Sequence, residues 1–293
     1  MLAGPILHGC AGRNRLTPAS NPPWPRHTGG LNIRLDAGLG QEGATIYLNM
    51  STTISVDQIH RCISRNRWQY LVYIGLSMGV AGATRFVQLS NPLHFRRFLG
   101  GVDPFIAMVL VGVAGLFLLS FLLSRGWFSI HERADFRSLG WTSGIAALLA
   151  SLAIALDLTI VFPADMNIPF PASLLFYPSI GFLVEILFHV LPLSLLLFLL
   201  TSFFKNLGAG KAIGISILVV SLLEPTYQAI AMASSGHYPR WAVLYVGFHI
   251  FLINSFQLLI FKRYDFFSMY AFRLAYYLVW HVAWGYLRLQ VLF

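Results

Sequence analysis

Charged residues are scarce in this chain of 293 residues. Asp, Glu, Lys and Arg together make up 11% of it, whereas a soluble domain carries about 25% charged residues. So few charges cannot cover a surface that faces water, which excludes a soluble globular protein. Cysteine is also rare: Cys10 and Cys62 both precede the first long apolar run and form neither a metal-binding nor a disulfide framework.

Apolar residues are abundant instead, and they are arranged in long runs. Hydrophobic residues make up 57% of the chain, and their continuous runs are typical of an integral membrane protein. The formal net charge is +9. However, the basic residues lie between the apolar runs and are not clustered on one soluble face, which excludes nucleic acid as a partner.

The apolar runs predict the fold class. Each is close to the roughly 20 residues that a helix needs to cross about 30 Å of hydrocarbon. Strands of a membrane barrel would alternate in polarity, which these runs do not. We therefore predict an all-α, polytopic transmembrane helix bundle of about seven helices, over residues 69–88, 104–124, 138–162, 172–200, 212–233, 241–261 and 266–288.

Three parts of the chain differ in composition. Residues 1–49 are rich in Gly and Pro, include the run Pro22-Pro23-Trp24-Pro25 and lack the apolar core of a signal peptide. This predicts a disordered or non-native upstream segment, with Met50 as the biological start. Residues 50–67 then form a short basic cytoplasmic segment, and 68–293 form the helix bundle.

Basic residues in short loops favour the cytoplasmic side of a membrane. With a cytoplasmic N-terminus, the inner flanks hold more of them than the outer flanks. The lack of a targeting segment favours a bacterial plasma membrane. The inner set is Arg61, Arg65, Arg67, Arg125, Arg133, Arg137, Lys205, Lys211, Lys262 and Arg263, and the outer set is Arg85, Arg96, Arg97, Arg240 and Arg288.

Ionisable groups inside the apolar runs are the candidate functional residues, because a charged side chain at the bilayer centre costs about 2.5–3.5 kcal/mol. Glu185 and His189 are four residues apart, as are Glu224 and Gln228, so each pair shares a helix face. At about 1.5 Å per residue, Glu185, Glu224 and His281 lie at similar depths. We therefore predict a polar site that contains all five residues.

Structural roles are the alternative for such residues, since polar side chains also join transmembrane helices by hydrogen bonds. We favour that role for Asp157, His249 and Asn254. Arg273 follows Asp265 by eight positions and is expected near the inner interface, where its head group can reach water. The aromatic residues of the last segment are expected at the membrane interface or in the core.

Three short stretches resemble the motifs EExxxR, FxxxH and HxxxN of the CPBP family, which contains CAAX-prenyl-protease and bacteriocin-processing intramembrane peptidases. They are Val184-Glu185-Ile186-Leu187-Phe188-His189, Glu224-Pro225-Thr226-Tyr227-Gln228 and His281-Val282-Ala283-Trp284-Gly285. The resemblance covers about 170–290. Glu185 matches the second Glu of the first motif, and His281 matches the His of the third. His189 stands in place of the Arg of the first motif, Gln228 in place of the His of the second, and Gly285 in place of the Asn of the third.

The resemblance implies hydrolysis of a peptide bond within the bilayer, where a Glu and a His activate water and the last motif stabilises the oxyanion. Gln228 cannot act as a base, and Gly285 has no side chain that could donate a hydrogen bond. In a rearranged site, Glu185 or Glu224 is the base, His281 the electrophile and Gln228 the oxyanion donor. The substrate is then a membrane-associated peptide or protein.

Two other chemistries fit the same residues. Glu185, His189, Glu224 and His281 offer a mixed oxygen and nitrogen set that suits a divalent cation such as zinc. Alternatively, the chain is a non-catalytic CPBP-like scaffold that binds a partner or membrane lipids. A small-molecule transporter is a third alternative, although its expected inverted repeats are not found.

Overall fold

The computed structural model describes residues 56–132, 136–204 and 206–293. The predictions for residues 1–49, for a start at Met50 and for Cys10 fall outside these ranges, as do the flanking residues Arg133 and Lys205.

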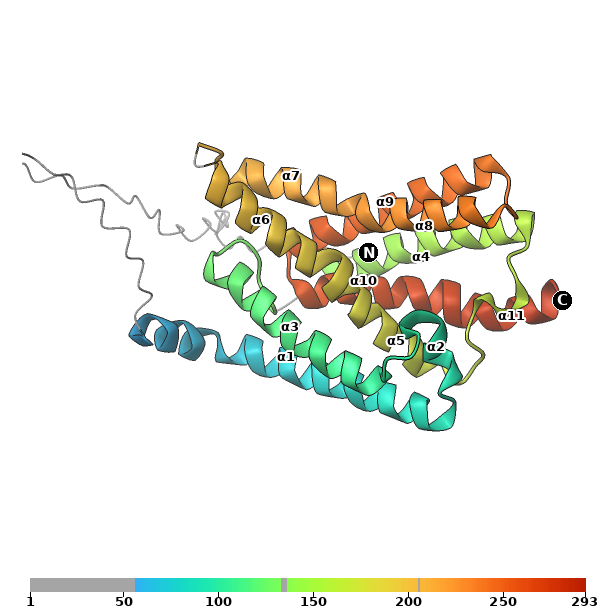
Figure 1. The fold of residues 1–293 in the computed structure, drawn as a ribbon, viewed down its shortest axis with the longest axis horizontal. Helices are drawn as coiled ribbons and strands as arrows, with labels where there is room; N and C mark the ends of the chain where they lie inside the picture. Colours follow the sequence, from blue (N-terminus) through green and yellow to red (C-terminus); the bar gives the residue numbers. More distant parts are fainter. Residues whose placement is uncertain (1–55, 133–135, 205) are drawn as a thin grey trace, which may run out of the picture. The chain divides into compact units, whose positions relative to one another are not determined.

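The described residues form helices and turns, without strands, as the apolar runs predict (Figure 1). Two of the segments, η2 and η3, are π-helical, and η1 is a short 3₁₀ turn. The elements in order are α1 (Val56–Ser90), α2 (Leu93–Leu99), α3 (Pro104–Ser124), α4 (Phe136–Ile160), η1 (Ala164–Met166), α5 (Ser173–Val184), η2 (Glu185–Val190), α6 (Leu191–Phe203), α7 (Ala209–Ser221), α8 (Leu223–Ser235), α9 (Arg240–Arg263), α10 (Phe266–Tyr277), η3 (Leu278–Trp284) and α11 (Gly285–Val291).

Six helical stretches among the described residues are long and apolar enough to cross a membrane: Asn66–Ser90, Pro104–Ser124, Arg137–Ile160, Ser173–Phe203, Ala209–Ser235 and Arg240–Arg263. They correspond to the first six predicted segments, so the chain is a multi-pass integral membrane protein. The seventh predicted segment is helical from Phe266 to Val291 but does not meet the same criterion. That it crosses the membrane stays a prediction.

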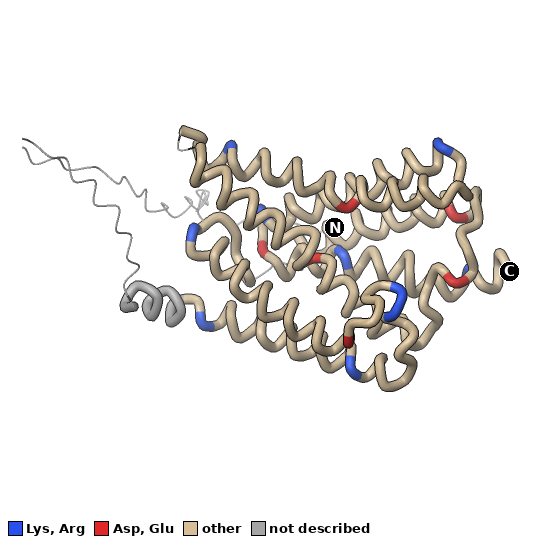
Figure 2. The backbone as a smooth tube through the Cα atoms, viewed as in Figure 1, with Lys and Arg blue, Asp and Glu red and all other residues tan. Residues whose placement is uncertain are grey.

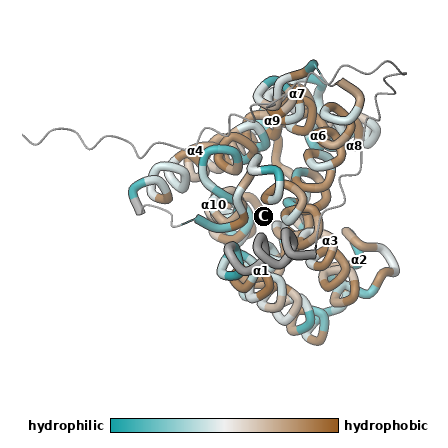
Figure 3. The backbone as a smooth tube through the Cα atoms, turned by 90° about the vertical axis from the view of Figure 1, so that its left-hand side faces the viewer, coloured by the Kyte–Doolittle hydropathy of each residue, from teal (hydrophilic) through white to brown (hydrophobic). Residues whose placement is uncertain are grey.

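The exterior of the bundle is apolar. Large hydrophobic side chains point outward, among them Phe117, which is 71% exposed, and Leu244, which is 74% exposed. Figure 3 shows hydrophobic positions along the labelled helices, and Figure 2 shows most Lys and Arg positions near helix ends. Polar side chains such as Glu185, Asn254 and Gln257 are buried instead. This distribution suits a molecule whose surrounding solvent is lipid.

Helix α10 lies inside the bundle, where it packs against α4, α5 and α9. Its first turn is fixed by Asp265, whose carboxylate accepts hydrogen bonds from the backbone N–H of Ser268 and of Glu132, both at 2.6 Å. An Asp at this position satisfies N–H groups that the helix leaves unpaired. The cap thus ties the start of α10 to the loop that follows α3.

An equivalent cap lies at the start of the second span. Asp103 precedes α3 and accepts hydrogen bonds from the Ile106 N–H at 3.0 Å and from Gln88 Nε2 at 2.8 Å. The Ile106 N–H, followed by the Gln88 amide, lowers the pKa of the Asp103 carboxyl from its ordinary value.

A buried ion pair joins α4 to α11. Arg288, one of the basic residues assigned above to the outer flanks, is 0% exposed; the side of the membrane on which it lies stays a prediction. Its Nε and Nη2 lie 2.7 and 2.9 Å from the two oxygens of Asp157. The Trp284 indole N–H and the Phe162 backbone N–H complete the shell of that carboxylate. The Asp157 side chain therefore has a structural role, as predicted.

A close approach of three elements occurs at Gly115 of α3. A Cβ at this position would meet the Tyr73 hydroxyl of α1, and it would lie 2.7 Å from Cδ1 of Ile186 in η2. Small residues allow membrane helices to pack closely. Among the described residues, no atom beyond the neighbouring residues and backbone of the same helix lies within 4 Å of a Cβ built at Gly82 of α1, so that position serves as its matched control.

We predict that Gly115→Ala lowers the free energy of unfolding by about 1–3 kcal/mol, because the added methyl overfills this contact. Gly82→Ala should leave it unchanged or raise it slightly, because Ala is the better helix former. Thermal unfolding in detergent, followed by tryptophan fluorescence, would measure both. Equal midpoints for the two variants would contradict the close packing at Gly115.

Candidate functional site

Glu185 is the first residue of η2 and is completely buried. Its Oε1 accepts hydrogen bonds from Arg273 Nε at 2.5 Å and from Gln257 Nε2. Its Oε2 lies 3.2 Å from Nδ1 of His189. The predicted pairing of Glu185 and His189 is therefore present, but the carboxylate is also neutralised by a cation from another helix.

That cation, Arg273, corrects an expectation. Its head group does not reach water, because the residue is only 3% exposed. Its Nη1 donates to the Tyr277 hydroxyl and its Nη2 to Gln257 Oε1, both at 3.0 Å. The same Nη2 lies 3.5 Å from Glu224 Oε2. The physical reason is that α10 is enclosed by other helices, so an Arg on it takes buried carboxylates as partners.

Glu224 and Gln228 share one face of α8, as their spacing predicts. Gln228 Nε2 donates to Glu224 Oε1 at 2.9 Å. Arg273 thus stands between two glutamates from different helices, η2 and α8. The structure brings together four of the five predicted site residues, Glu185, His189, Glu224 and Gln228, around Arg273 and Gln257, which the sequence analysis did not assign to the site.

His281 has a different set of neighbours. Its Nδ1 lies 2.7 Å from Asn167 Oδ1, and its ring stacks on Tyr177 with centroids 4.4 Å apart. It follows Arg273 by eight residues on one continuous helix, a separation of about 12 Å along the axis. The structure therefore shows no direct contact of His281 with either glutamate among the described interactions.

The loop residue Asn167 also occupies the space beside Gly285. A Cβ at position 285 would lie 3.1 Å from the side chain of Asn167. Because Gly285 has no side chain, the Asn167 carboxamide can pack there and reach His281. Nδ2 of Asn167 is buried without a hydrogen-bond partner.

Both π-helical segments carry candidate site residues. Glu185 and His189 lie in η2, and His281 lies in η3. Single π-helical turns inside α-helices occur frequently at functional sites. Pro192 follows η2 and lacks an N–H, which removes one helical hydrogen bond at this point. A similar irregularity at Leu222, between α7 and α8, lies beside Glu224 and Pro225.

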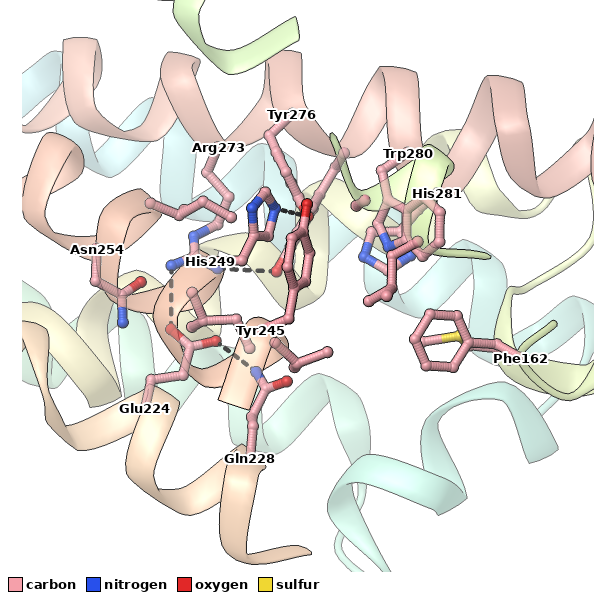
Figure 4. A pocket seen from close by; sticks show the side chains of 17 residues that line it. Phe162, Glu224, Gln228, Tyr245, His249, Asn254, Arg273, Tyr276, Trp280 and His281 are labelled. Carbon is pink, nitrogen blue, oxygen red and sulfur yellow. Dashed lines mark hydrogen bonds and ion pairs between the residues drawn. The ribbon is translucent and has the colours of Figure 1, made fainter. Parts of the chain in front are cut away.

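A cavity of about 150 Å³ lies next to this cluster, between α4, α8, α9, α10 and η3. Glu224 and Arg273 line one part of it and His281 another (Figure 4). Asn254 also lines it and is completely buried, and neither of its side-chain polar atoms has a hydrogen-bond partner in the part of the chain that the structure describes. Glu185 and His189 are not among its lining residues.

His249 lines the same cavity, and its Nε2 lies 3.3 Å from the Tyr276 hydroxyl. This contact joins α9 to α10 and agrees with the structural role predicted for His249. For Asn254 the structural role stays a prediction, because among the described residues it has no hydrogen bond to a neighbouring helix.

The described residues contain no group of three or more His, Cys, Asp or Glu side chains that could hold a metal ion. Glu185 and Glu224 each have Arg273 as a neighbour, and His281 has Asn167. The predicted zinc site stays a prediction.

Comparison with known proteins adds no assignment: neither a family model, nor a curated protein, nor a solved structure matches the chain.

Proposed function

We propose that this multi-pass membrane protein binds a small polar ligand in the cavity between α8, α9 and α10, on a scaffold similar to that of the CPBP peptidases and without peptide hydrolysis. The observation that carries the proposal is Asn254. A buried amide without partners costs free energy, and this one lines a cavity that can hold the missing partner. Ligand pockets commonly place a few such polar groups among apolar walls.

The carboxylates support binding over catalysis. A general base must be free to accept a proton from water. Oε1 of Glu185 accepts hydrogen bonds from Arg273 and Gln257, Oε2 faces His189 Nδ1 without a hydrogen bond among the described residues, and the side chain has no exposed surface that water could reach. Glu224 Oε1 is bonded to Gln228 and its Oε2 faces Arg273. In this arrangement the glutamates hold their neighbours in place, and Glu224 also presents its charge to the cavity.

Peptide hydrolysis is the second candidate, because Glu224 and His281 line the same cavity. A peptide carbonyl placed between them could be attacked by a water that gives its proton to Glu224, while His281 donates a hydrogen bond to the carbonyl oxygen. This candidate keeps the activity implied by the resemblance to CPBP peptidases.

A thermal-shift screen of the detergent-purified protein with a library of small polar compounds would test ligand binding. We expect at least one compound to raise the unfolding midpoint by a few degrees, as a ligand near 100 times its Kd stabilises by about 2.7 kcal/mol. Asn254→Leu should abolish that shift, because it removes both polar atoms and fills part of the cavity. Asn206→Leu, at an exposed position outside this cavity, should retain it.

No stabilising compound, or a shift that persists in Asn254→Leu, would contradict the proposal. The same preparations incubated with quenched fluorescent peptides separate the two candidates. Cleavage by the wild type that is lost in Glu224→Gln would establish hydrolysis instead.

A further inference from the structure

Formal charges in the side-chain cluster beside the cavity are not balanced. Two carboxylates, Glu185 and Glu224, face one guanidinium, that of Arg273. The guanidinium is closer to Glu185, at 2.5 Å, than to Glu224, at 3.5 Å. Of the other titratable side chains, His189 contacts Glu185, and Tyr277 accepts a hydrogen bond from Arg273. His249 and His281 line the cavity, but among the described residues no ion pair joins either of them to Glu224. Glu224 is therefore the carboxylate with incomplete neutralisation, and it is the one that lines the cavity.

An uncompensated carboxylate inside a helix bundle is costly unless a cation approaches it. The cavity lining contains a hydrogen-bond acceptor and aromatic rings that could bind such a cation. Asn254 Oδ1 is an acceptor without a donor, and an ammonium group has three N–H donors and no acceptor. The aromatic rings of Tyr245, Tyr276 and Trp280 also line the cavity, and aromatic faces attract cations.

The dimensions limit the size of the ligand. The cavity measures about 150 Å³, and a cavity of about this volume in another protein admits benzene. Apolar walls from Ala153, Leu156 and Ile253 suit a short hydrocarbon body. A ligand of about six to eight non-hydrogen atoms with one charged end therefore fits both the volume and the lining.

We infer that the cavity takes a small organic amine, bound as its ammonium ion with Glu224 as counter-ion and Asn254 as hydrogen-bond acceptor. This inference rests on the ligand-binding function proposed above and specifies its ligand class.

Two isosteric probes, benzylamine and benzyl alcohol, test the inference on the full chain purified in detergent at pH 7. Titration calorimetry would measure affinity, and the fluorescence of Trp280, compared with that of Trp280→Phe, would report occupancy of this cavity. We expect benzylamine to bind at least about tenfold more tightly than benzyl alcohol, since an ammonium gains a charge-assisted contact that the hydroxyl lacks. Glu224→Gln should abolish this preference.

The matched control is Asp165→Asn, because the Asp165 side chain is 86% exposed and lies in a loop turn; it should keep the wild-type preference. Equal affinities of the two probes for the wild type would overturn the amine assignment and leave the binding function standing. Binding of neither probe, together with a thermal-shift screen without a stabilising compound, would overturn both. Displacement of benzylamine by NaCl but not by choline chloride at equal ionic strength would identify an inorganic cation as the occupant instead. If Glu224→Gln does not fold, the ratio of the two probes in the wild type decides.

Discussion

Replacement of Arg273 by Met should lower the free energy of unfolding by about 3–5 kcal/mol, because it leaves a buried charge cluster without its cation. Without the guanidinium, the remaining polar neighbours of Glu185 are His189 and Gln257, and that of Glu224 is Gln228. Met has a similar length and no charge, so the loss of packing is small. Chemical unfolding in mixed micelles, followed by tryptophan fluorescence, would measure the change.

Two further variants make this expectation specific. Glu185→Gln introduced into Arg273→Met should recover part of the lost stability, since it removes one of the unpaired carboxylates. Arg96→Met is the matched control, because Arg96 is exposed in the last turn of α2, and it should change the stability by less than about 0.5 kcal/mol. An Arg273→Met protein as stable as Arg96→Met would contradict the role of the guanidinium as shared counter-ion.

The transmembrane helices could be predicted from the sequence because hydrocarbon imposes a minimum apolar length. The segment predicted at 104–124 has the same bounds as α3. The contacts within a helix could also be predicted: Glu185 with His189 and Glu224 with Gln228 both follow from a spacing of four residues.

Contacts between helices could not be predicted, because depth in the membrane does not determine which way a helix faces. Glu185 and Glu224, which were predicted at similar depths, do share Arg273 as a neighbour. His281 was predicted at a similar depth but contacts Asn167 instead. The position of Arg273 was misjudged because the snorkelling argument requires a helix face in contact with lipid. Helix α10 is enclosed by α4, α5 and α9, which also explains how the last segment can carry so many polar residues.

Loss of the Asp157 carboxylate should lower the free energy of unfolding as much as loss of Arg273, for a different geometric reason. Asp157 accepts four hydrogen bonds, from Arg288 Nε and Nη2, from the Trp284 indole N–H and from the Phe162 backbone N–H. Asp157→Ala leaves all these donors without their acceptor and leaves the Arg288 charge buried, although its guanidinium keeps the carbonyl oxygens of Phe162 and Pro163. We expect the free energy of unfolding to fall by about 3–5 kcal/mol.

Asp157→Leu combined with Arg288→Met separates the buried charge from the lost hydrogen bonds. An apolar pair of similar volume is often tolerated where a broken ion pair is not, so the double variant should be more stable than Asp157→Ala. It should still be less stable than the wild type, because the Phe162 N–H and the Trp284 N–H keep no acceptor. Asp103→Ala, which removes a partly exposed helix cap, should lower the free energy of unfolding by less than Asp157→Ala does. If the double variant proves no more stable than Asp157→Ala, the lost hydrogen bonds carry the whole effect, and the charge of Arg288 is accommodated by the carbonyl oxygens around it.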